Sequence, residues 1–334
     1  MSAMSRQRLA VIGGGSWGTA LAVVLGVQRP VRLWVREPEI AASIASCREN
    51  PVFLPGVTIP EHVTCSTDLA VTVADAQIVL TVMPSHVCRP VMLALRPHLP
   101  PDAIVVSATK GLEDGTLFRM TEVIEAVLGA STPLAVLSGP SFAREVARGD
   151  PTALVIAARD LGVAHHLQGE LSGPSFRLYT SQDVAGVELA AALKNVIAIA
   201  AGICDGLGLG SNSIAALIAR GLAEMTRLVC ACGGRPETLA GLAGLGDLVL
   251  TCTGGLSRNR TVGAALGQGR KLPEILGEMK MVAEGVKTTS TAIALAQRHG
   301  VELPIAAQMQ RVLFEGLDPR AALRELMERT LKAE

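Results

Sequence analysis

Residues 9–19 read Leu9-Ala10-Val11-Ile12-Gly13-Gly14-Gly15-Ser16-Trp17-Gly18-Thr19. Four apolar residues, typical of a buried strand, lead into a Gly-x-Gly-x-x-Gly pattern, and an apolar helix is predicted over Thr19–Val27. In this setting Gly13 permits a tight turn, Gly15 lets the backbone approach a pyrophosphate, and Gly18 lets the helix pack closely on the strand. The pattern predicts a dinucleotide site at the helix N-terminus. The alternative is a glycine-rich turn without a ligand.

The first half of the chain alternates short apolar runs with helical stretches. Most runs are continuously apolar, as in strands buried on both faces, and the alternation is typical of βαβ units with a parallel sheet. The predicted strands are Leu9–Gly13, Val31–Val35, Ile78–Met83, Ile104–Ala108, Leu134–Leu137 and Leu154–Ala157, with Phe176–Thr180 as a last candidate.

The pattern changes near Asp183, beyond which glycine clusters separate long helical patterns. We predict helices over Val184–Ile203, Asn212–Cys232 and Pro236–Cys252, and several more from Arg258 onward. The sequence therefore predicts an α/β fold: a Rossmann-like, doubly wound parallel sheet over residues 1–183. An all-α domain is expected over residues 184–334.

The composition narrows the function classes. The chain has 334 residues, of which 49% are hydrophobic and 2% aromatic, with 30 basic and 30 acidic side chains. A neutral chain with few rings is a poor nucleic-acid binder. Seven cysteines without a Cys-x-x-Cys pair argue against zinc and a disulfide framework, so we expect no metal and a cytoplasmic protein.

The most apolar segment is Leu189–Cys204. Lys194 and Asn195 interrupt it, and it is shorter than the roughly 20 residues that span a bilayer. We therefore expect no membrane insertion, although the mean hydropathy is +0.40.

Arg36 and Glu37 follow the second predicted strand. Dinucleotide folds often place an acid there for the ribose 2′-hydroxyl of NAD, whereas an arginine accommodates the 2′-phosphate of NADP. We infer that NADP is accepted, alongside NAD. A solvated arginine at a strand end is the alternative.

Lys194 lies on an otherwise apolar helix. A lysine in such surroundings loses hydration, which lowers its pKa and suits it for proton transfer. The alternative is a lysine that extends its ammonium to water along an amphipathic face.

Further polar groups follow glycines. Asp247 and Thr251 would share one helix face, with a simple N-cap as the alternative for Asp247. Ser257-Arg258-Asn259 offers a hydroxyl, a guanidinium and an amide that match the oxygens of a phosphate monoester. The alternative is a solvated basic loop. Lys110 and the segment Ser138–Ser141 follow predicted strands at the carboxyl edge of the sheet, where ligands bind in open α/β folds. We interpret Arg220 and Glu224, one helical turn apart, as structural.

Seven motifs follow one another along the chain: Gly13–Ala20, Lys110-Gly111, Leu137–Ala143, Ala192–Val196, Leu245–Leu248, Ser257–Asn259 and Val282–Gly285. In this combination the sequence resembles the bacterial-type NAD(P)-dependent glycerol-3-phosphate dehydrogenase family over nearly its whole length.

The resemblance implies residue roles. Lys194 would accept the proton in glycerol 3-phosphate oxidation and donate it in the reverse direction, with Asp247 and Thr251 completing its polar network. Lys110 would contact both ligands and polarise the C2 oxygen. The implied substrate residues are Lys110, Gly139, Ser141, Lys194, Asp247, Ser257, Arg258 and Asn259. The implied residues for NAD or NADP are Gly13, Gly15, Ser16, Trp17, Gly18, Arg36, Lys110, Ala143, Arg258, Val282 and Glu284.

The resulting hypothesis is reversible hydride transfer between glycerol 3-phosphate and dihydroxyacetone phosphate, mainly as reduction for phospholipid synthesis. Two alternatives stay open: another two-domain NAD(P)-dependent hydroxyacid dehydrogenase, which would bind a substrate carboxylate, and a non-catalytic dinucleotide sensor. We expect a small-molecule substrate and no nucleic-acid partner. For the assembly we consider a homodimer.

Overall fold

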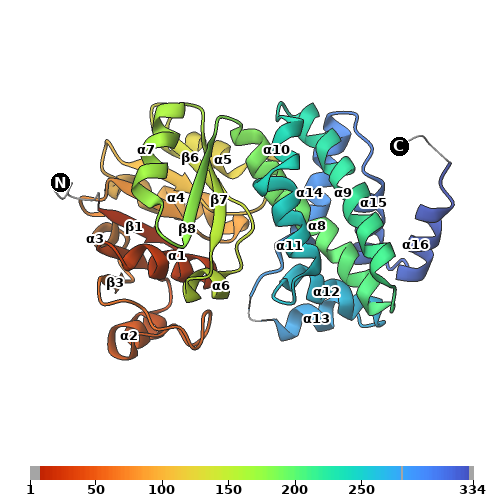
Figure 1. Ribbon diagram of the computed structural model, residues 1–334, viewed down its shortest axis with the longest axis horizontal. Helices are drawn as coiled ribbons and strands as arrows, with labels where there is room; N and C mark the ends of the chain where they lie inside the picture. Colours follow the sequence, from red (N-terminus) through yellow and green to blue (C-terminus); the bar gives the residue numbers. More distant parts are fainter. Residues whose placement is uncertain (1–7, 280, 331–334) are drawn as a thin grey trace. The chain divides into compact units, whose positions relative to one another are not determined.

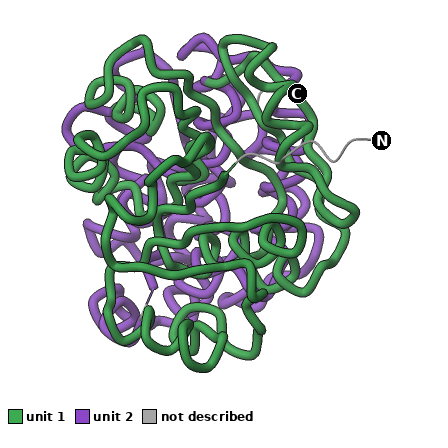
Figure 2. The backbone as a smooth tube through the Cα atoms, turned by 90° about the vertical axis from the view of Figure 1, so that its left-hand side faces the viewer, with its two compact units in different colours: residues 1–110, 118–184 green, residues 111–117, 185–334 purple. Residues whose placement is uncertain are grey.

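The computed structural model describes residues 8–279 and 281–330. The chain divides into two compact units, drawn in two colours in Figure 2: Met1–Lys110 with Phe118–Val184, and Gly111–Leu117 with Ala185–Glu334. The short segment 111–117 belongs to the second unit because Leu112 and Leu117 pack into that unit's core. The domain boundary after residue 183 stays a prediction. A single boundary does not account for residues 111–117, which lie within the first half of the chain but belong to the second unit.

The first unit is built on one sheet, which Figure 1 shows with helices around it. Its strands in the described residues are β1 (Leu9–Ile12), β2 (Val31–Trp34), β3 (Val63–Ser66), β4 (Ile78–Thr81), β5 (Ile104–Ser107), β6 (Leu134–Ser138), β7 (Thr152–Ala158) and β8 (Phe176–Ser181). Their order is β3-β2-β1-β4-β5-β6-β7-β8. The predicted α/β fold is confirmed, with two corrections: β6 and β7 pair antiparallel, and β3 was not predicted.

Helices cover both faces of this sheet. The helices are α1 (Ser16–Gly26), α2 (Pro38–Cys47), α3 (Leu69–Val73), α4 (Cys88–Leu95), α5 (Met120–Leu128), α6 (Ala143–Arg148) and α7 (Leu161–Leu171), with short 3₁₀ turns η1 (Ser85–Val87) and η2 (Arg96–His98). Val11 of β1 packs in one core cluster with Leu21 of α1, and the next residue, Ile12, packs in another with Met92 of α4. This alternation explains the continuously apolar strands, because neither face of β1 meets water.

The strand order reverses at β1. This strand pairs with β2 on one side and with β4 on the other. The loop after β1 therefore starts at the switch point of the sheet, where open α/β folds bind their ligands.

The second unit is built from helices around α8 (Val184–Gly206). The others are α9 (Ser211–Ala231), α10 (Pro236–Ala240), a π-helical turn η3 (Leu242–Gly246), α11 (Asp247–Thr253), α12 (Arg258–Gly267), α13 (Leu272–Glu278), α14 (Glu284–Arg298), α15 (Pro304–Phe314) and α16 (Pro319–Met327). The prediction of one helix over Pro236–Cys252 is wrong. Gly241 adopts an extended conformation after α10, and the chain then restarts through the π-helical turn.

Helix α8 is the core helix of this unit. It has 23 residues and is apolar enough to cross a membrane by length and composition, but its most apolar window is entirely buried inside the protein. It is longer than the predicted helix, which ended at Ile203. Its side chains form the centre of an aliphatic cluster with α9, α11, α12, α14 and α15.

Helices α8 and α12 touch through their backbones. A Cβ atom added to Gly263 of α12 would lie 2.0 Å from the carbonyl oxygen of Ile199, and one added to Gly202 of α8 would lie 2.0 Å from that of Arg260. Gly206 and Gly267 continue this contact one turn further along. The contact sets the position of the N-terminus of α12 relative to α8.

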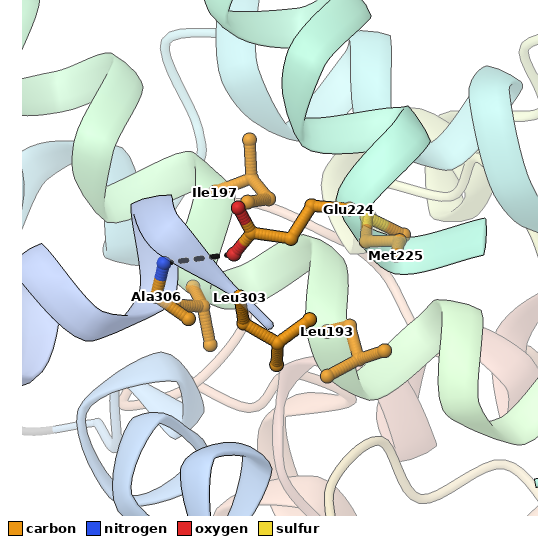
Figure 3. A pocket seen from close by; sticks show the side chains of 7 residues that line it. Leu193, Ile197, Glu224, Met225, Leu303 and Ala306 are labelled. Carbon is orange, nitrogen blue, oxygen red and sulfur yellow. Dashed lines mark hydrogen bonds between the residues drawn. The ribbon is translucent and has the colours of Figure 1, made fainter. Parts of the chain in front are cut away.

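Glu224 of α9 is buried and binds the N-terminus of α15. Its two carboxylate oxygens accept hydrogen bonds from the backbone N–H groups of Ile305 (2.8 Å) and Ala306 (2.9 Å). Figure 3 shows the carboxylate pointing at Ala306 beside a small cavity lined by Leu193, Ile197 and Leu303. Burial raises the pKa of Glu224 to about 7, against the lowering effect of the two backbone hydrogen bonds. Glu224 was interpreted as structural together with Arg220, one helical turn away. The partners of its carboxylate are these two backbone amides.

This geometry predicts a pH-dependent stability. Since the pKa of Glu224 is about 7 in the folded protein and 4.5 in its ordinary state, proton binding favours folding. The contribution is complete below pH 4.5 and is lost as the pH rises to about 7. Over that range the unfolding free energy should fall by on the order of 3 kcal/mol relative to Glu224→Gln. Unfolding of both proteins measured from pH 4.5 to 8 checks this.

The exposed Glu237 of α10 provides the control, because Glu237→Gln removes a carboxylate from the surface. That variant should follow the wild-type pH dependence. Parallel curves for wild type and Glu224→Gln would contradict the prediction.

Candidate active site

The loop after β1 fits a dinucleotide pyrophosphate. Gly13 has φ +128°, and a Cβ there would lie 2.0 Å from the carbonyl oxygen of Val82. A Cβ on Gly18 would lie 1.8 Å from the carbonyl oxygen of Gly13, so only glycine lets α1 approach the turn. A Cβ on Gly15 would meet nothing within 4 Å. Gly15 thus borders open space at the N-terminus of α1, where backbone N–H groups favour anions.

Trp17 belongs to the same loop and turns one polar atom inward. Its indole Nε1 is buried without a hydrogen-bond partner among the described residues. Ser16, the first residue of α1, stands next to it. Both predicted cofactor residues therefore belong to the first turn of α1, directly after Gly15.

Arg36 lies just after β2 and is exposed, with 76% of its side chain accessible. Its Nε and Nη2 atoms donate to Glu37 Oε1, at 3.0 and 2.6 Å. The guanidinium of Arg36 is therefore accessible to a ligand at the end of β2, although it also forms an ion pair with Glu37.

Three predicted residues meet at the carboxyl ends of β5 and β6, which pair in parallel. Lys110 Nζ and Ser141 Oγ both donate to the carbonyl oxygen of Gly139, at 3.3 and 3.0 Å. Gly139 has φ +142°, and an added Cβ would press on Leu154 at 2.9 Å. Ala143 begins helix α6 directly after this turn. The first unit thus presents a cation and a hydroxyl on one glycine turn.

The second unit holds a buried polar triad. Lys194 Nζ donates to Asp247 Oδ1 and to Thr251 Oγ1, both at 2.6 Å, and Thr251 Oγ1 donates to the Asp247 carbonyl oxygen at 2.6 Å. Lys194 is 5% exposed and Asp247 is 1% exposed. The ammonium of Lys194 therefore does not extend to bulk water. The N-cap of helix α11 is Gly246, and Asp247 is the first residue of that helix. Burial strips water from the ammonium while the carboxylate balances its charge.

Ser257 and Asn259 flank the start of α12. Ser257 caps the helix, with its Oγ accepting from the Arg260 N–H at 3.2 Å. Asn259 is buried: its Nδ2 donates to Asn195 Oδ1 at 2.9 Å, and its Oδ1 accepts from the Gly285 N–H at 2.9 Å. Within residues 8–279 and 281–330, the hydroxyl hydrogen of Ser257 and the second Nδ2 hydrogen of Asn259 have no acceptor, so both remain for a ligand.

Arg258 reaches the segment before α14. Its Nη1 donates to the Val282 carbonyl oxygen at 3.0 Å. Burial lowers the pKa of the Arg258 guanidinium, and the nearby carboxylate of Glu284 acts against this lowering. The structure therefore brings together Arg258, Val282 and Glu284, three of the predicted cofactor residues.

Sequence reasoning assigned no role to Asn195. This residue is buried next to Lys194, and its carboxamide links α8 to Asn259 and, through it, to α14. A Cβ on Gly285 would lie 2.5 Å from the Asn195 carbonyl oxygen, so α14 begins directly against α8. The polar side chain beside Lys194 on an apolar helix was the signal available in the sequence.

Other chemistry is limited in the part of the chain that the structure describes. All seven cysteines are free thiols. Residues 8–279 and 281–330 hold no group of three His, Cys, Asp or Glu side chains placed to bind a metal. The expectation of no metal stays a prediction.

Two family models match the chain. The model described as NAD-dependent glycerol-3-phosphate dehydrogenase N-terminus matches residues 8–164, and the corresponding C-terminus model matches residues 183–324. The chain belongs to the NAD-dependent glycerol-3-phosphate dehydrogenase family. The resemblance read from the sequence motifs is thereby confirmed.

Members of this glycerol-3-phosphate dehydrogenase family resemble the chain end to end. Glycerol-3-phosphate dehydrogenase [NAD(P)+] of Koribacter versatilis (strain Ellin345) is 60% identical, over 96% of this chain and 97% of the relative. The enzyme of the same name from Citrifermentans bemidjiense is 54% identical, over 98% and 99%. The crystal structure of glycerol-3-phosphate dehydrogenase from Coxiella burnetii has a TM-score of 0.93 and 43% identity, covering 98% of this chain and all of that one.

Proposed function

We propose that this protein is an NAD(P)-dependent sn-glycerol-3-phosphate dehydrogenase, which interconverts glycerol 3-phosphate and dihydroxyacetone phosphate. The observation that carries the proposal is the buried Lys194–Asp247–Thr251 triad in a member of this family. A lysine held between a carboxylate and a hydroxyl is suited to move a proton at a fixed point.

The residues of this chain bind, orient and protonate the substrate. When bound, the nicotinamide cofactor would supply the hydride that C2 gains in reduction and would take up the hydride that C2 loses in oxidation. In reduction, Lys194 Nζ donates a proton to the C2 oxygen, and in oxidation it takes the hydroxyl proton back. Lys110 contacts both ligands and polarises the same oxygen. Asp247 and Thr251 orient Nζ through their 2.6 Å contacts.

The substrate phosphate needs cations and hydrogen-bond donors. We propose that Ser257, Arg258 and Asn259 hold it. Gly139 and Ser141 are proposed as further substrate residues. A fixed phosphate would keep C2 within reach of Lys194 Nζ. Such positioning of the reacting groups contributes much of an enzyme's rate enhancement.

NAD or NADP would occupy the loop after β1. Gly13 and Gly15 belong to that loop, Ser16, Trp17 and Gly18 form the first turn of α1, and the open space at Gly15 supports the fit. The remaining proposed cofactor residues are Arg36, Lys110, Ala143, Arg258, Val282 and Glu284.

We further propose that reduction of dihydroxyacetone phosphate dominates and feeds phospholipid synthesis. A cytoplasmic protein without membrane insertion is supported by the seven free thiols and by the burial of α8. For the assembly we propose a homodimer. Light scattering after size exclusion measures the assembly.

The test of the activity is a steady-state assay of NADH and NADPH consumption with dihydroxyacetone phosphate. Turnover should occur with this ketone and not with carboxylate-bearing substrates of other two-domain dehydrogenases. Consumption with a keto acid instead would favour a hydroxyacid dehydrogenase. Tight cofactor binding without turnover on any triose phosphate would favour a dinucleotide sensor.

Arg36→Ala should separate the two cofactors. The guanidinium of Arg36 is the cation offered at the end of β2, so its loss should raise the Michaelis constant for NADPH about tenfold. The value for NADH should change by less than about twofold, because NAD carries no 2′-phosphate. Initial rates over a range of each cofactor give both constants, and equal effects would remove Arg36 as a 2′-phosphate ligand.

A further inference from the structure

Asn50 is a fully buried polar residue outside the Gly-x-Gly-x-x-Gly pattern that nevertheless bonds to it. It lies shortly after α2, in the segment that leads to β3, and has no exposed surface. Its Nδ2 donates to the carbonyl oxygen of Gly14 at 2.8 Å and to Thr19 Oγ1 at 2.9 Å. Its Oδ1 accepts from the Phe53 N–H at 3.1 Å. Both Nδ2 hydrogens are therefore committed to the loop after β1.

These bonds fix the orientation of one peptide group. The carbonyl oxygen of Gly14 also accepts from Thr19 Oγ1, at 3.3 Å. In a trans peptide the N–H of the next residue points away from the carbonyl, and the described chain has no cis peptide bond. Holding the Gly14 oxygen toward Asn50 therefore turns the Gly15 N–H to the opposite side.

The surroundings of the loop show why this orientation is useful. A Cβ on Gly14 would lie 2.1 Å from Val35 Cγ1, so this residue is packed against the end of β2. Gly15 borders the open space at the start of α1. A backbone N–H aimed into open space at a helix N-terminus is a donor for an anion.

We propose that Asn50 is a positioning residue of the dinucleotide site, which orients the Gly14–Gly15 peptide so that the Gly15 N–H meets the pyrophosphate. The inference rests on the proposed cofactor site, and it adds a residue about thirty positions beyond that site's sequence motif. Because NAD and NADP share the pyrophosphate, Asn50 acts on both cofactors alike. It touches neither the 2′-phosphate nor the triose phosphate.

A simpler role for Asn50 would be to tether the segment before β3. Arg48 already does so: its Nε donates to the Ile59 carbonyl oxygen at 3.1 Å, and its Nη2 donates to the carbonyl oxygens of Pro60 and Val63. No hydrogen bond between Arg48 and the loop after β1 occurs in the described part of the chain. Arg48→Met therefore loosens the same segment without touching the Gly14 peptide, and it serves as the matched control.

The experiment measures dissociation constants of NADH and NADPH by fluorescence titration, without turnover. Asn50→Ala should weaken both cofactors by about tenfold, in equal proportion. The Michaelis constant for dihydroxyacetone phosphate should stay within about twofold of wild type, since the substrate does not contact this loop. Thr19→Val, which removes the second acceptor of Asn50 and keeps the shape of the side chain, should weaken both cofactors in the same sense. This second variant tests the inference if Asn50→Ala does not fold.

Two results would overturn the inference. One is an unchanged affinity for both cofactors in folded Asn50→Ala or Thr19→Val. The other is an equal loss in Arg48→Met, which would assign the effect to the tethered segment in general. Failure of the proposed function is a separate outcome, because a protein that binds both cofactors but reduces no triose phosphate would still report the role of Asn50.

Discussion

Replacing Lys194 with alanine is expected to lower kcat for dihydroxyacetone phosphate reduction by a factor of about 10²–10⁴. Nζ is the atom proposed to give the C2 oxygen its proton, and alanine has no acidic group to replace it. Dissociation constants of NADH and NADPH should stay near wild type, because their proposed pyrophosphate site belongs to the loop after β1. Stopped-flow or steady-state rates combined with fluorescence titration measure both quantities.

The control for this prediction is Lys287→Ala. Lys287 lies on α14 and is exposed, so its removal takes away one positive charge without touching the triad. That variant should keep wild-type turnover. Wild-type turnover in Lys194→Ala would end the assignment of Lys194 as the proton donor.

Asp247→Leu is expected to lower the unfolding midpoint temperature by on the order of 10 °C. Removing one partner of a buried ion pair leaves the other charge uncompensated, which costs about 3–5 kcal/mol. A domain of roughly 150–250 residues loses about 2–4 °C per kcal/mol. The pair qualifies because both side chains are almost fully buried and their charged atoms are 2.6 Å apart. Thermal unfolding followed by circular dichroism measures the shift.

The double variant Lys194→Met with Asp247→Leu separates stability from chemistry. It replaces both charges with apolar side chains, which is often neutral or stabilising at buried sites. Most of the lost midpoint temperature should return, while activity stays absent. A single variant Asp247→Leu as stable as wild type would contradict a charged, buried pair.

Much of the sheet was predictable because burial dictates its composition. Strand β1 is apolar at every position and β4 at every position but its last, Thr81, since both faces are covered. The missed strand β3 reads Val63-Thr64-Cys65-Ser66, and only its first residue is buried. This strand lies at one edge of the sheet and is mostly polar, so it lacks the apolar run that identified the others. The antiparallel pairing of β6 and β7 was likewise invisible, because single strands carry no record of direction.

The helical unit was less predictable in detail. The pattern from Pro236 to Cys252 keeps a helical period, yet the chain leaves the helix at Gly241 and resumes through a π-helical turn. The sequence placed Asp247 and Thr251 on one face of a helix. Their contact with Lys194 joins positions more than fifty residues apart, which periodicity does not encode.

Asn50 illustrates a third kind of gap. It stands between Glu49 and Pro51 in a polar stretch with no motif, so nothing local distinguishes it from a solvated turn residue. Only the folded chain brings it under the glycine loop, where its amide finds two acceptors. Residues that act through a backbone carbonyl leave no pattern of their own.

The backbone contact between α8 and α12 bears on which substrates the protein accepts. The two helices touch at Gly202 and Gly263, and peptide groups have the same dimensions whatever the sequence around them. The spacing between Lys194 on one helix and Ser257 at the start of the other therefore cannot be shortened by trimming a side chain at this contact. Changing this spacing would require one helix to slide along the other, which would separate the paired glycines. Evolution toward a different carbon-chain length is thus expected to change side chains in the loops and to leave these glycines alone.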